Sequence, residues 1–151
     1  MGILLGLHLL AAIVWVGGMF FAYICLRPVA ADVLEPPQRL VLWEGVFSRF
    51  FVCVWGAVCL LLVSGHGMIA VLGGMAAVPV HVPLMMLWGY PMVLLFGYLY
   101  FWPYLSFKSL VAEQRWPDAA KQLNRIRQIV VINLCLGLIV VLLGSSGRFL
   151  F

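Results

Sequence analysis

Four long runs of apolar residues, separated by short polar or turn-forming segments, dominate the chain. The first run extends from about residue 3 to residue 26, and the others cover about 37–70, 83–103 and 117–145. An α-helix needs about 20 apolar residues to cross the hydrocarbon core of a bilayer, and each run reaches that length. The pattern therefore predicts an all-α integral membrane protein, in which residues 1–151 form a single bundle of four transmembrane helices.

Proline and glycine mark the ends of the predicted helices. The first helix is expected to end near Arg27-Pro28, because arginine favours the aqueous edge and proline lacks a backbone donor. The second and fourth begin with proline in the first turn, outside the lipid, and the second enters the membrane near Phe50. The third begins near Pro83, after a link broken by glycine and proline, and Pro91 is expected to kink it.

The composition places the chain in the membrane rather than in water. Hydrophobic residues make up 66% of it and charged residues only 9%, and the mean hydropathy is +1.14. A soluble domain of this size could not bury so much apolar surface. The net charge of +4 does not indicate nucleic-acid binding, because the cations flank the apolar runs and form no patch with interleaved aromatic residues. The partner that the composition predicts is the lipid bilayer.

The charges also predict an orientation. Eight of the nine Lys and Arg residues, and all five acidic residues, fall in the first and third links or just beside them. By the positive-inside rule these two links face the cytoplasm. Both termini are then expected on the outer side, which is the periplasmic side if the membrane is the inner membrane of a bacterium.

The three histidines all fall near that outer side. His8 lies about five residues into the first helix, roughly 7 Å deep at 1.5 Å per residue, and His66 lies at a similar depth in the second helix. His81 directly precedes the third helix. Each could simply satisfy a hydrogen bond between helices, but three polar residues at one end of a bundle also suggest a cofactor or metal site.

The main sequence-based hypothesis is a b-type haem used for electron transfer. His8 is the expected axial ligand, His81 the expected second one and His66 its substitute, because haem iron takes one ligand on each side of the ring. Trp15 and Gly18 follow His8 on the first helix and could line the macrocycle. They could equally serve helix packing. The haem would exchange electrons with a membrane or periplasmic partner.

Copper is the alternative, because methionines accompany the histidines. Met68 lies two residues from His66, and Met85 and Met86 follow His81 closely. Imidazole combined with soft thioethers favours Cu(I), although methionine is also a common packing residue. A third hypothesis is a non-catalytic accessory subunit, or a homo-oligomer, that packs within a larger membrane complex. The four cysteines form no CxxC pair and are expected to fill apolar space.

Short motifs along most of the chain resemble a known family. The segment from His8 through Trp15 to Phe21, followed by Arg27-Pro28, resembles the opening of CopD-family membrane proteins, which are named for copper resistance. The layout is also similar to that of the HemJ-type protoporphyrinogen oxidases. Further matching pieces are Phe50-Phe51, Ser64-Gly65, His81 with Met85, Leu123-Asn124-Arg125-Ile126-Arg127, Asn133-Leu134 and Leu136-Gly137.

The two resemblances imply different chemistry. The HemJ resemblance implies a haem-dependent oxidoreductase with His8 and His81 at the haem. The CopD resemblance implies a link to periplasmic copper.

Overall fold

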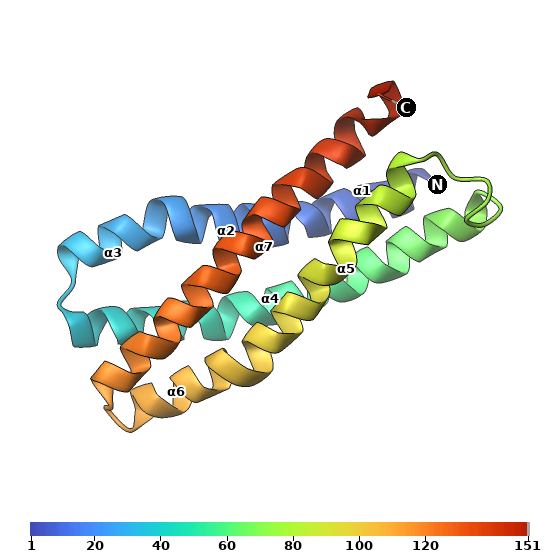
Figure 1. Cartoon of the computed structure of the whole chain (residues 1–151). Coiled ribbons are helices and arrows are strands. Elements are labelled where there is room, and N and C mark those ends of the chain that lie inside the picture. Colours follow the sequence, from blue (N-terminus) through green and yellow to red (C-terminus); the bar gives the residue numbers. More distant parts are fainter. Residues whose placement is uncertain (151) are drawn as a thin grey trace.

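The computed structural model describes residues 1–150, which fold into four long helices joined by three short links (Figure 1). The helices follow one another along the chain, and three of the segments within them are π-helical. The elements are α1 (Gly2–Ala12), η1 (Ile13–Gly17), α2 (Gly18–Phe20), η2 (Phe21–Leu26) and α3 (Arg27–Val33) in the first helix, α4 (Pro36–Val71) in the second, α5 (His81–Leu99), η3 (Tyr100–Tyr104) and α6 (Leu105–Ala112) in the third, and α7 (Trp116–Leu150) in the fourth.

Each helix is long and apolar enough to cross a membrane. The most apolar window in each has a mean hydropathy between 1.6 and 2.5. Large apolar side chains cover the outside of the bundle; Ile3 is 81% exposed and Leu94 is 74% exposed. Because such a surface is stable against lipid and not against water, the chain is a multi-pass helical membrane protein. The fold class expected from the sequence, a four-helix membrane bundle, is confirmed.

Two helices continue beyond the prolines at which we expected them to end. The first helix passes Pro28 and reaches Val33, and the third passes Pro103 and reaches Ala112. In both places a π-helical segment adjoins the proline: η2 ends just before Arg27-Pro28, and η3 contains Pro103. The wider hydrogen-bonding pattern of a π segment leaves room for a residue without a backbone donor, so the helix need not break.

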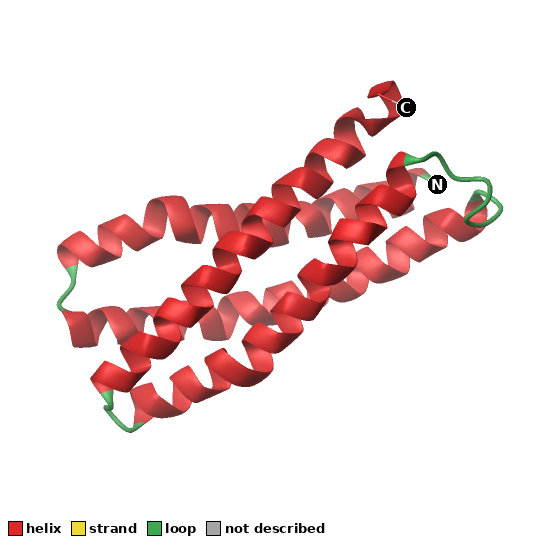
Figure 2. Ribbon diagram, in the orientation of Figure 1, coloured by secondary structure: helices red, strands yellow, loops and turns green. Residues whose placement is uncertain are grey.

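The two ends of the bundle differ in what they carry (Figures 1 and 2). Both termini and the link of residues 72–80 lie at one end, which we call the terminal end. The links at residues 34–35 and 113–115 lie at the other, which we call the basic end because the arginines of the charged links gather there. The terminal end is the one that the positive-inside rule predicts to face outward.

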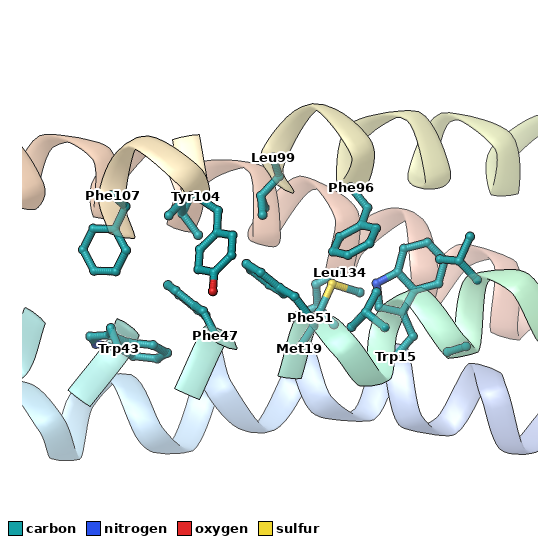
Figure 3. Packing of buried hydrophobic residues seen from close by; sticks show 14 of the residues in the cluster. Trp15, Met19, Trp43, Phe47, Phe51, Phe96, Leu99, Tyr104, Phe107 and Leu134 are labelled. Atoms are coloured by element: carbon teal, nitrogen blue, oxygen red, sulfur yellow. The ribbon is translucent and has the colours of Figure 1, made fainter. Parts of the chain in front are cut away.

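Aromatic side chains fill the centre of the bundle (Figure 3). Phe47 and Phe51, one turn apart on α4, stack with ring centroids 5.1 Å apart. Tyr104 meets Phe51 edge to face at 4.8 Å, and Phe96 meets it at 5.6 Å. Edge-to-face pairs are favourable beyond the area they bury, and they lock the second helix against the third.

Candidate metal site at the terminal end

The structure places each histidine at a different helix interface. His8 is in α1, His66 is near the end of α4, and His81 is the first residue of α5. Their nearest partners come from α4, α5 and α7 respectively. The three side chains therefore share one end of the bundle, as their positions in the sequence predicted, while their immediate surroundings differ.

His8 is held by a short relay of hydrogen bonds to α4. Its Nδ1 lies 2.9 Å from Ser64 Oγ, and that hydroxyl donates to the carbonyl of Leu60 at 2.5 Å. Because Ser64 uses its proton on Leu60, the network assigns the His8 proton to Nδ1. The lone pair then lies on Nε2. The His8 ring lies directly beside Gly65, where a Cβ would be 3.4 Å from His8 Cε1, an ordinary contact.

His66 has both ring nitrogens in hydrogen bonds. Nδ1 lies 2.8 Å from the carbonyl of Leu62, and Nε2 lies 2.9 Å from the hydroxyl of Tyr90 on α5. Only a donor can face a carbonyl, so Nδ1 carries the proton and Nε2 accepts from Tyr90. A metal could bind His66 only by displacing one of these partners.

His81 packs against the glycine face of α7. A Cβ at Gly147 would overlap the His81 Cβ and lie 2.9 Å from its Cγ. One turn further along α5, the Met85 methyl lies 3.0 Å from where a Cβ of Gly144 would be. His81 and Met85 thus face the same helix side by side.

The Nδ1 atom of His81 is buried and has no hydrogen-bond partner among the described residues. A buried nitrogen without a partner is costly unless something else binds it. Imidazole nitrogen and thioether sulfur are both donors that suit a soft metal ion, so the residue types at His81 and Met85 fit Cu(I).

The other methionines contribute less defined positions. Met68 on α4 and Met86 on α5 are half-buried, and Met75 lies exposed in the link between the helices. Among the described residues no group of three or more His, Cys, Asp or Glu side chains could hold a metal ion.

Trp15 and Gly18, expected to line a haem, are both occupied by helix packing. Trp15 is 3% exposed and meets the Phe96 ring edge to face, with centroids 6.0 Å apart. The ring of Phe50 covers Gly18 so closely that a Cβ there would overlap it. Both residues contribute to contacts between the first helix and its neighbours, and nothing in the described residues supports a haem.

The sequence did not reveal which residues fix the histidines. Ser64 was part of a matching motif with no assigned role, and nothing in the sequence pairs it with His8 or pairs Tyr90 with His66. Gly144 and Gly147 are the surface on which Met85 and His81 rest. Their spacing along the fourth apolar run, together with Gly137, was the available signal, because small residues on one helix face permit close approach.

The sequence model of the family described as Copper resistance protein D matches residues 44–146, more than half of the chain. Comparison with curated proteins and with solved structures gives no match. The matched residues include His66, His81 and Met85, whereas His8 lies before them.

Proposed function

We propose that this chain, which belongs to the copper resistance protein D family, binds Cu(I) at the terminal end of its helical bundle between α5 and α7. Family membership links the chain to copper resistance and favours the copper hypothesis over the haem hypothesis. Copper here is the ion that the protein handles, not a structural cofactor.

The pairing of His81 with Met85 is the observation that supports the site. The two residues lie one turn apart and rest on Gly147 and Gly144 of α7. Nδ1 of His81 is buried and lacks a hydrogen-bond partner among the described residues, and in the tautomer that carries the proton on Nε2 it presents a lone pair to a metal. Both residues also lie within the part of the chain that matches the family.

The donor set suits the monovalent state of copper. A thioether is a soft, neutral ligand, and a neutral imidazole adds a nitrogen donor without adding charge. Two neutral ligands leave the ion with its single positive charge, which a membrane interior tolerates better than a divalent ion. Met86 and Met68 are the nearest further thioethers in sequence to His81 and His66, and they are our candidates for receiving the ion in transfer.

The orientation of the bundle determines which side of the membrane the proposed Cu(I) site faces. If the basic end faces the cytoplasm, the Cu(I) site lies at the outer surface, which is the periplasmic side of a bacterial inner membrane. The protein would then meet copper that has entered the periplasm. A larger membrane complex or a second copy of the chain could share the site.

Cu(I) titration of the detergent-purified protein against a chromophoric chelator tests the proposal. We expect stoichiometric binding that weakens by at least about 10–100-fold in His81→Ala, because losing even a residue that only supports a metal ligand costs that much. Met85→Leu keeps the volume and shape of the side chain while removing sulfur, so it should weaken binding without changing stability by more than about 1.5 kcal/mol.

Met75→Leu is the matched control, because Met75 lies exposed in the link and should not contribute. Equal affinity in wild type and His81→Ala would contradict the site. A Soret band in the purified protein, lost in His8→Ala, would restore the haem hypothesis. Binding of neither group, with co-purification of a larger complex, would favour an accessory subunit.

A further inference from the structure

Three arginines from separate helices converge at the basic end, opposite the proposed copper site. Arg27 begins α3, Arg39 lies in the first turns of α4, and Arg127 lies in α7. Arg27 and Arg39 both act electrostatically on Arg127. Three like charges held close together in a partly buried place are unfavourable unless an anion accompanies them.

Protein groups do not neutralise this cluster. The guanidinium of Arg27 lies 4.8 Å from the centroid of the Tyr23 ring, and that of Arg127 lies 5.8 Å from the Trp43 ring. Arg39 Nη2 donates to the carbonyl of Leu34 at 3.2 Å. Within residues 1–150 no carboxylate forms an ion pair with any of the three arginines.

Two acidic residues of this end, Glu35 and Asp118, have other partners. Glu35 caps the start of α4: its side chain accepts a hydrogen bond from the backbone of Gln38, and the Gln38 side chain accepts one from the Glu35 backbone N–H. Asp118 accepts from Arg115 at 2.8 Å and from Lys121 at 3.2 Å. Neither carboxylate pairs with the arginine cluster, and no ion pair within residues 1–150 joins any other carboxylate to it.

Several donors of the cluster are buried without a partner. These are Nε of Arg39, Nε of Arg127 and Nε1 of Trp43. All three atoms can only donate. Buried donors without acceptors are rare in folded proteins, and a set of them beside unpaired positive charge calls for an acceptor that carries negative charge.

A cavity of about 320 Å³ lies between the starts of α4 and α7, and Arg39 and Arg127 form part of its wall. Its lining is Pro36, Arg39, Leu40, Trp116, Pro117, Ala120, Leu123 and Arg127. That volume is at the small end of ligand sites, about right for a compact polar group. Two basic side chains in a wall that is otherwise mainly apolar favour a ligand with a charged head.

We infer that this cavity binds a phosphate-bearing anion through Arg39 and Arg127, with Arg27 adding charge. Guanidinium groups recognise phosphate through paired donors, and both Arg39 and Arg127 line the cavity. The cavity lies at the first turns of α4 and α7, which the sequence predicts to project out of the lipid, so the headgroup of an anionic phospholipid is the expected source. Basic pockets between helices at this level of a membrane are suited to such headgroups. The inference is independent of the copper proposal.

Ligand-dependent thermal stabilisation in a neutral detergent tests the site. The probes are short-chain phosphatidylglycerol, short-chain phosphatidylcholine and inorganic phosphate. We expect phosphatidylglycerol to stabilise the wild type at lower concentration than phosphatidylcholine does. In Arg39→Gln/Arg127→Gln its apparent affinity should fall about tenfold or more, because two charge-assisted contacts are lost.

Arg125→Gln is the matched control, since Arg125 is an exposed arginine two residues from Arg127 on the same helix. It should change the affinity less than about twofold, as expected for a surface charge. In phosphate-free detergent without lipid, Arg127→Gln should be at least as stable as wild type, because it relieves repulsion. A merely structural role for Arg127 predicts the opposite.

The remaining outcomes separate the sources and the failures. Binding of inorganic phosphate with no preference for phosphatidylglycerol would support the site and assign it to a soluble phosphate compound. No stabilisation by any probe, or equal losses in Arg125→Gln and the double variant, would overturn the inference. If the double variant does not fold, Arg39→Gln and Arg127→Gln are compared singly by the same measurement.

Discussion

At the scale of single residues, the three histidines differ in which ring nitrogen is free to accept a metal. His66 has both nitrogens in hydrogen bonds, His8 has Nε2 available, and His81 has a buried Nδ1 with no partner. The sequence predicted that the three histidines lie at the same end of the bundle, because the rise per residue of a helix gives the depth of each side chain in the membrane. It could not predict their partners, because Ser64 and Tyr90 come from other helices whose rotation is set by packing.

Ser64 gives a residue-scale test of the relay to His8. Ser64→Ala should destabilise the protein by about 1–2 kcal/mol, because His8 Nδ1–H loses its acceptor inside a helix interface. Cu(I) affinity at His81 should stay within about twofold of wild type, since the two histidines lie at different interfaces. Unfolding by sodium dodecyl sulfate in mixed micelles measures the stability change.

Ser48→Ala is the control for this substitution. The Ser48 hydroxyl donates to the carbonyl of Gly45 in its own helix and joins no second helix. Its removal should change stability by less than about 0.5 kcal/mol. Similar losses in both variants would mean that the His8 contact contributes nothing.

At the scale of elements, glycines on α7 set how closely α5 approaches. Val16 and Met92 fill the space beside Gly137, Met85 lies against Gly144, and His81 lies against Gly147. The sequence predicted the four helices from their apolar length, but it placed the ends of two of them at prolines. It could not show the π segments, because their hydrogen-bonding pattern depends on local packing and leaves no compositional trace.

Gly147→Ala tests the link between this packing and copper binding. The added Cβ would overlap His81, so the imidazole must shift and Cu(I) affinity should fall about tenfold or more, as expected when the support of a metal ligand is lost. The same chelator competition used for His81→Ala measures the change.

Two other glycines provide controls at the same scale. Gly137→Ala crowds Val16 and Met92, far along α7 from His81, and should cost about 1–3 kcal/mol of stability while copper affinity is retained. Gly56→Ala faces open space and should be neutral or slightly stabilising, by up to about 1 kcal/mol. Unchanged copper affinity in Gly147→Ala would argue against the close α5–α7 contact at His81.

At the scale of the whole molecule, the two ends of the bundle have separate chemistry. The terminal end carries histidine and methionine, and the basic end carries unpaired arginines around a cavity. Charge patterning along the sequence predicted the division into two ends. The convergence of Arg27, Arg39 and Arg127 could not be predicted, because three residues far apart in sequence meet only through the tertiary arrangement of three helices.

The orientation of the bundle can be measured with single cysteines in a variant whose four native cysteines are replaced by serine. Met75→Cys lies in the link at the terminal end, and Gln114→Cys lies in the link at the basic end. A membrane-impermeant thiol reagent should label Met75→Cys in intact cells and Gln114→Cys only after permeabilisation, because the positive-inside rule predicts that the basic end faces the cytoplasm. The reverse labelling would place the copper site on the cytoplasmic side.

X-ray absorption spectroscopy of the Cu(I)-loaded wild-type protein tests the central claim most directly, because it identifies the atoms bound to copper. We expect a mixed shell of imidazole nitrogen and thioether sulfur, from His81 and Met85, with the sulfur contribution reduced in Met85→Leu. A shell of nitrogen and oxygen alone, unchanged in that variant, would contradict a His–Met copper site between α5 and α7.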